Sequence, residues 1–202
     1  TPIGYVFAIA ALLLNFTFFF LGVFQIVPAF FEAQEASIRG YMYLLPVTFI
    51  LMVPAVSMRL WSEEKKQGTF ELLMTLPLTD MELIVAKFLA AWSFVAGLIF
   101  ASLPLALNIA ILGRMDYGST FALYIGALLM GGAYVSMGML LSALTSEQVV
   151  AFILIFIASL YMFLSNFFVV TRHLEPGIAR MIGFFSHSYH FSSFVSGVIH
   201  PG

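Results

Sequence analysis

The residues that could carry chemistry gather in residues 59–88, the only long polar interruption in an otherwise apolar sequence. Within this stretch, Glu63 and Glu64 form an adjacent carboxylate pair. The stretch also holds seven further charged residues, Arg59, Lys65, Lys66, Glu71, Asp80, Glu82 and Lys87. A second candidate is the pair His187 and His190, whose spacing would let both side chains bind one metal ion from a single helix face. We expect a chain that concentrates its charge in one segment to use that segment.

Neither candidate completes a catalytic motif. The E-E-x-x-x-R pattern of intramembrane prenyl-protein proteases requires an arginine where this chain has Gly68, and all 4 histidines lie far away, from His173 onward. Only Glu175 could join the histidine pair as a nearby ligand, which favours hydrated histidines at the membrane surface over a metal site. The sequence contains no P-loop and no G-x-S-x-G turn. It contains 0 cysteines, which excludes disulfides and thiolate metal sites. We therefore expect no catalytic residue, no metal and no directly bound cofactor.

The composition indicates a membrane protein. Of the 202 residues, 62% are hydrophobic and 9% are charged, whereas soluble domains have about 25% charged residues. The apolar runs are continuous rather than alternating and about 20 residues long, which predicts helices that cross a lipid bilayer. The net charge of -2 gives no reason to expect a nucleic-acid partner. The predicted fold class is all-α, with residues 1–202 forming a single polytopic domain.

Apolar runs predict five spans and two short helices at the outer membrane surface. The short surface helices are expected at about 174–200. Pro46 and Pro54 lie inside the second span and predict bends in that helix. Asn15 lies inside the first span, and its side chain is expected to bond to a neighbouring helix. Because the sequence begins with Thr1, we expect it to be part of a longer chain. The spans are expected at about 4–27, 41–60, 83–112, 120–144 and 149–170.

The charged stretch itself contains signals for helix starts and stops. Thr69 is positioned to cap a short helix through its hydroxyl, and Pro77 would end that helix. Phe70, Leu73 and Met74 would give it one apolar face. Capping boxes at 79–82 and 145–148 would start the third and fifth spans. Glu63 and Glu64 are expected in the loop before the short helix.

Small residues recur at helix-packing intervals in the third and fourth spans. Lysine and arginine residues are concentrated in and around 59–88, so the positive-inside rule places this loop in the cytoplasm and the C-terminal tail outside. The packing candidates are Ser93, Gly97, Ala127, Gly131, Gly132 and Ser136.

Several motifs of this stretch resemble the signature of ABC-2 type permeases. They are the segments 58–64 and 68–77, together with Glu82 and the pair Lys87 and Phe88. The pattern is most similar to the branch associated with gliding motility, with Ala86 standing where many relatives have glycine. Residues 1–5, 54–55 and 189–191 also resemble that branch, so the resemblance covers nearly the whole sequence.

The resemblance implies an exporter subunit of the bacterial inner membrane, with a sixth span beyond this sequence. It implies a second permease protomer, identical or related, and a separate ATP-binding subunit that holds ATP and Mg. Residues 68–76 would be the coupling helix, docked in a groove of the ATPase. The residues implied to couple to the ATPase are Glu63, Glu64, Gly68, Thr69, Phe70, Glu71, Leu72, Leu73, Thr75 and Pro77.

Two functions are compatible with this resemblance. In the first, ATP-driven closure of the partner pushes on the coupling helix, and the second and third spans move as rigid bodies that pivot near Pro46 and Pro54. A substrate would then cross the membrane between protomers. In the second, the chain is a membrane anchor or force-transmitting subunit of a motility or envelope complex and moves no solute.

Overall fold

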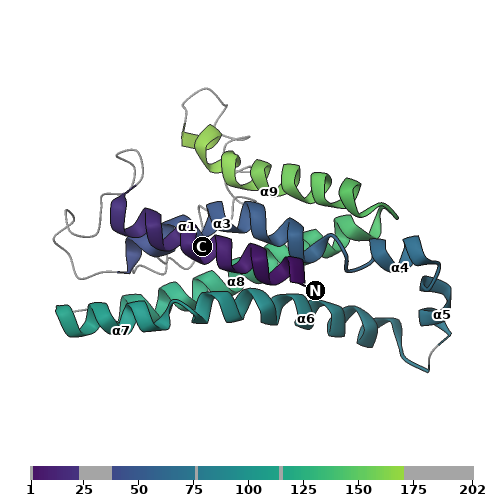
Figure 1. Ribbon diagram of the computed structural model, residues 1–202, viewed down its shortest axis with the longest axis horizontal. Helices are drawn as coiled ribbons and strands as arrows, with labels where there is room; N and C mark the ends of the chain where they lie inside the picture. The colour runs from purple at the N-terminus through teal and green to yellow at the C-terminus, as the bar shows by residue number, and fades with distance from the viewer. Residues whose placement is uncertain (1, 23–37, 76, 114–115, 171–202) are drawn as a thin grey trace.

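The computed structural model describes residues 2–22, 38–75, 77–113 and 116–170 (Figure 1). Regular structure in these ranges is entirely α-helical, which confirms the predicted all-α class. The expected surface helices at 174–200, with His187 and His190, lie outside the described residues. The helices are α1 (Pro2–Leu21), α3 (Arg39–Ser57), α4 (Ser62–Gln67), α5 (Phe70–Met74), α6 (Asp80–Phe100), α7 (Leu103–Leu112), α8 (Tyr117–Ala143) and α9 (Gln148–Val170).

Three stretches of helix in the described ranges are long and apolar enough to cross a membrane: Arg39–Gln67, Asp80–Leu112 and Tyr117–Ala143. Two shorter apolar helices cover Tyr5–Leu21 and Gln148–Leu164. These segments overlap the five predicted spans, although a crossing by each of the five stays a prediction.

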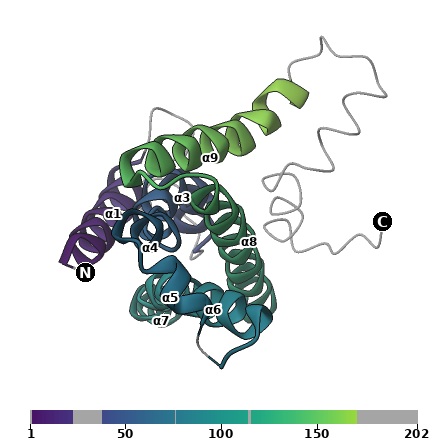
Figure 2. The same cartoon turned by 90° about the vertical axis from the view of Figure 1, so that its right-hand side faces the viewer.

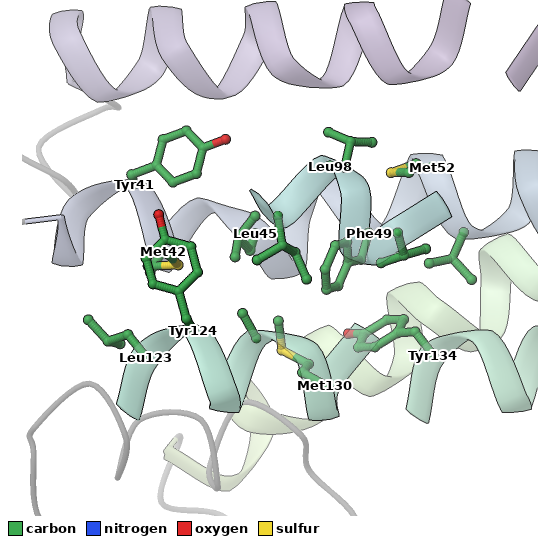
Figure 3. Close-up of a cluster of buried hydrophobic side chains, with 14 of the residues drawn as sticks. Tyr41, Met42, Leu45, Phe49, Met52, Leu98, Leu123, Tyr124, Met130 and Tyr134 are labelled. Atoms are coloured by element: carbon green, nitrogen blue, oxygen red, sulfur yellow. The ribbon is translucent and has the colours of Figure 1, made fainter. Parts of the chain in front are cut away.

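Helix α3 lies at the centre of the bundle. It packs against α1, α8 and α9, while α6 packs mainly against α8 (Figure 2). In the most apolar part of α3, 72% of the residues are buried, against 44% in each of the other two long stretches, which fits a helix that is hydrophobic on all sides. Its core side chains include Phe49, whose ring lies 5.8 Å from the Tyr134 ring of α8 (Figure 3). The Tyr41 ring packs against Phe16 and Phe19 of α1.

A hydrogen bond joins α1 to α3 in the apolar interior. The Asn15 amide donates to the Thr48 hydroxyl at 2.5 Å, and both side chains are buried. Such a bond satisfies polar groups that lipid cannot. The prediction that Asn15 bonds to a neighbouring helix is confirmed.

The predicted third span, 83–112, is divided into α6 and α7 at residues 101–102. Pro104 lacks the N–H that would bond the Phe100 carbonyl, so it interrupts the helical ladder. The Ser102 hydroxyl donates to the Ile99 carbonyl at 2.7 Å and lies 2.8 Å from the Tyr124 hydroxyl of α8. The break is thus held in place by α8.

Small residues of α8 lie at close helix contacts. A Cβ atom on Gly131 would lie 2.9 Å from Val95 of α6, and one on Gly132 would lie 3.2 Å from Trp92. Ala127 is fully buried. The other three packing candidates, Ser93, Gly97 and Ser136, are exposed, and a Cβ on Gly97 would meet no atom within 4 Å.

Candidate functional site

The charged stretch forms two short helices at one end of the bundle (Figure 1). We call residues 61–75, which contain α4 and α5, the α4–α5 elbow. The chain turns between the two helices at Gly68, whose φ of 69° is left-handed. Glycine adopts this conformation without a Cβ penalty, so it suits a helix end that must turn sharply.

The carboxylate pair lies on a helix, which corrects the prediction of a loop. Glu63 and Glu64 occupy the first turn of α4, and Lys65 and Lys66 occupy its last turn. This order of charges complements the helix dipole. Glu63 also accepts a hydrogen bond from Gln67 at 3.2 Å. The pair therefore stabilises α4 locally.

Lys87 binds α6 to the junction between α3 and α4. Its ammonium forms an ion pair with Glu64, whose side chain is 28% exposed, while that of Lys87 is 15% exposed. It also donates to the Leu60 carbonyl at 2.5 Å and lies 4.6 Å from the centre of the Trp61 ring. One cation thus satisfies a carboxylate, a carbonyl and an aromatic face where three helices meet.

Ser142 of α8 acts as the N-terminal cap of α4. Trp61, in the capping position, makes no side-chain cap bond. Instead the buried Ser142 hydroxyl accepts from the N–H groups of Trp61 at 3.2 Å and Ser62 at 3.4 Å. It donates to the Met58 carbonyl at 3.1 Å. The two N–H groups would otherwise be among the unpaired donors of a helix start.

Replacing Ser142 by alanine is expected to destabilise the protein by about 1–3 kcal/mol, because buried backbone groups at the start of α4 lose their partner. Thermal unfolding of the detergent-purified protein measures this. Ser136→Ala is the matched control, since the exposed Ser136 hydroxyl bonds only to the Ala133 carbonyl of its own helix. Equal unfolding temperatures for Ser142→Ala and Ser136→Ala would contradict the capping role.

Helix α5 is shorter than the predicted 68–76, and Leu76 lies outside the described residues. Thr69 occupies the capping position, but its hydroxyl makes no cap bond, which corrects that prediction. It donates to the Glu64 carbonyl at 3.4 Å instead. The turn at Gly68 brings this carbonyl close to Thr69, whose own N–H also donates to it at 3.0 Å.

The apolar residues of α5 are divided between two sides. Phe70 is half-buried, with its ring 6.0 Å from the Trp61 ring and 5.6 Å from the Lys65 ammonium. Leu73 is also half-buried. Leu72 is 70% exposed and Met74 is 44% exposed. The outward surface of the elbow is therefore formed by Leu72 and Met74, with the exposed residues Glu71 and Thr75, and Pro77 is exposed just beyond the elbow.

The two predicted capping boxes have different outcomes. At the start of α6, the Thr79 hydroxyl accepts from the Glu82 N–H at 3.3 Å, and the Glu82 carboxylate accepts from the Thr79 N–H at 2.9 Å, so this box is confirmed. The box at 145–148 is not formed. Helix α9 begins only at Gln148, and the Thr145 hydroxyl accepts from the Glu147 N–H, two residues on, at 3.1 Å.

The geometry of the elbow favours contact with another protein. In the described ranges, no group of three or more His, Asp or Glu side chains could hold a metal ion. The elbow instead presents apolar side chains at a charged end of the bundle, supported from behind by ion pairs and aromatic contacts. Exposed apolar side chains with a polar rim are typical of an interaction site.

A family model described as "ABC-2 family transporter protein" matches residues 23–199. The chain belongs to the ABC-2 transporter family. It is therefore a multi-pass membrane subunit of the permease type, and its apolar helices agree with this. ABC-2 permease domains are typically non-catalytic, and the ATPase lies in an ATP-binding partner subunit. No curated protein and no solved structure matches the chain.

Proposed function

We propose that this ABC-2 family chain is the permease subunit of an ATP-driven exporter and that the α4–α5 elbow docks on the ATPase subunit. The observation that supports the proposal is the exposure of Leu72 and Met74 on a five-residue helix held firmly from behind. An apolar anchor of this kind on a rigid support is typical of an interface hot spot. Glu71, exposed beside Leu72, would pair with a polar group of the ATPase.

The proposal changes the set of coupling residues inferred from sequence. Glu71, Leu72, Thr75 and Pro77 keep a direct role because they are exposed. Gly68 and Thr69 set the turn that presents them. The remaining residues hold the elbow against the bundle and would act indirectly: Glu63, Glu64, Phe70 and Leu73.

The arrangement in the membrane follows from charge. Lysine and arginine side chains gather at the elbow, so this end faces the cytoplasm of a bacterial inner membrane. Each of the five apolar helical segments would cross this membrane. A second protomer, identical or related, would pack on exposed small residues of α6 such as Ser93, which allow close helix approach.

Replacing Leu72 by glutamate is expected to weaken binding of the ATPase subunit about 30-fold, the loss that corresponds to about 2 kcal/mol at an interface hot spot. Co-purification of the two subunits, followed by titration, measures this. Leu72→Met keeps the volume and polarity of the side chain and is expected to bind normally. Undiminished binding by Leu72→Glu would contradict the docking role of α5.

The similarity to the gliding-motility branch favours a second candidate, a force-transmitting membrane subunit that uses the same ATPase contact. The motif residues 68–77 carry this similarity. Purified complex in sealed vesicles discriminates the two functions. ATP-dependent accumulation of amphipathic cargo supports the exporter, whereas ATP hydrolysis that drives conformational change without flux of any cargo supports the second candidate.

A further inference from the structure

The lysines of α4 contact the turn that connects α8 to α9. The Lys65 ammonium donates to the carbonyl of Ala143, the last residue of α8. The Lys66 ammonium lies 2.9 Å from a carboxylate oxygen of Glu147, immediately before α9. A cation at the end of α8 complements the negative end of its dipole. Both ends of the α8–α9 turn are thus bound to one short helix.

Backbone contacts reinforce this connection. The Ser142 hydroxyl bonds the first N–H groups of α4 and the Met58 carbonyl, so the end of α8 and the start of α4 share one hydrogen-bond network. One turn earlier in α8, Gly138 contacts Ser57 of α3. Helix α4 also packs against α9, and Figures 1 and 2 both place α4 beside the α8–α9 turn.

Helix α5 has a different position in this network. It packs against α4, through Phe70 with Trp61 and Lys65. Helix α4 therefore lies between α5 and the α8–α9 turn, and it gives a force applied to α5 a route to α8 and α9.

We propose that α4, the end of α8 and the start of α9 move as one rigid unit that transmits displacement of α5 to the fourth and fifth membrane helices. Lys65, Lys66, Ser142 and Glu147 are its positioning residues. This inference rests on the proposed docking of the ATPase on α5. It differs from the expectation that the second and third spans move about Pro46 and Pro54, which lie buried in the central helix α3 and whose role as pivots stays a prediction.

Distances between spin labels in the intact complex with its ATPase test the unit. The chain has 0 cysteines, so introduced cysteines are its only thiols. The pair Gln67→Cys and Ser146→Cys, both exposed, spans α4 and the turn. The pair Leu13→Cys and Ser146→Cys measures the turn against α1. On trapping with ATP and vanadate, we expect an unchanged Gln67–Ser146 distance and a changed Leu13–Ser146 distance.

Two results overturn the rigid unit while leaving the proposed function intact. One is a change in the Gln67–Ser146 distance, and the other is an unchanged Leu13–Ser146 distance, each with the ATPase retained in the complex. Absence of the ATPase from the purified complex contradicts the proposed function itself. The two failures are therefore distinguishable in one preparation.

Charge exchange provides a second test. In the Ser142→Ala background, the hydrogen bonds of the Ser142 hydroxyl to α4 are already absent. Adding Lys66→Glu is expected to broaden the Gln67–Ser146 distance distribution, because the Lys66–Glu147 ion pair between α4 and the turn is lost as well. Adding Glu147→Lys restores the pair in reverse and is expected to narrow the distribution again. A distribution that stays broad in the exchanged variant overturns the positioning role of the Lys66–Glu147 pair.

Discussion

Replacing Gly138 by alanine is expected to lower the unfolding temperature of the protein by about 5 °C. A Cβ atom on Gly138 would lie 2.7 Å from both Cβ and Oγ of Ser57, and 3.4 Å from Val53. Ser57 is fully buried in the central helix, so the contact cannot be relieved by moving a flexible side chain into lipid. Overpacking of this kind costs about 1–3 kcal/mol, and each kcal/mol is worth about 2–4 °C in a domain of this size.

Two variants make the Gly138 experiment decisive. Gly97→Ala adds the same methyl group where no atom lies within 4 Å, so its unfolding temperature is expected to be no lower than that of the parent. Ser57→Gly combined with Gly138→Ala removes the atoms that clash, and the pair should be more stable than the sum of its single effects predicts. If Gly138→Ala and Gly97→Ala unfold at the same temperature, the close packing of α3 on α8 is wrong.

Replacing Lys87 by methionine is expected to destabilise the protein by about 1–3 kcal/mol and to release α6 from the elbow. The substitution removes the ion pair with Glu64, the bond to the Leu60 carbonyl and the contact with the Trp61 ring. It leaves the half-buried Glu64 carboxylate without its cation. Breaking a fully buried pair costs about 3–5 kcal/mol, and the partial exposure of this pair reduces the expected value. Thermal unfolding of the purified protein measures the effect.

Lys66→Met is the matched control for Lys87. Its ion pair with Glu147 has side chains that are 52% and 56% exposed, and exposed pairs contribute about 0–1 kcal/mol. Glu64→Gln combined with Lys87→Met removes the unpaired charge and is expected to recover part of the lost stability. A Lys87→Met protein no less stable than Lys66→Met would show that the ion pair does not hold α6 to the elbow.

Signals that are local in sequence predicted the structure well. The five long apolar runs overlap helices in the described ranges, because a continuous apolar run of about 20 residues favours a helix by its composition alone. The box at Thr79 and Glu82 formed because its two partners lie within one helical turn. The break between α6 and α7 was not predicted, because 83–112 was expected as one span, although Pro104 carried a local signal for it through its missing N–H.

Contacts between distant residues account for what the sequence did not predict. Helix α4 is six polar residues long, and its capping hydroxyl comes from Ser142, 80 positions beyond Ser62. Phe70 faces inward because Trp61 and Lys65 lie behind it, which no periodicity within α5 reveals. Single-helix patterns therefore placed Phe70, Leu73 and Met74 on one apolar face. In the structure Phe70 and Leu73 are half-buried, whereas Met74 is exposed.

Photo-crosslinking from the elbow tests the central claim most directly. A benzophenone amino acid at Leu72 would contact the partner, whereas one at Ile111, 84% exposed near the end of α7, would lie at the far end of the bundle. On illumination of intact membranes, the account predicts a covalent adduct between this chain and its ATPase subunit from Leu72 and none from Ile111. The absence of an adduct from Leu72 in a preparation that retains the ATPase, or an equal adduct from Ile111, would contradict it.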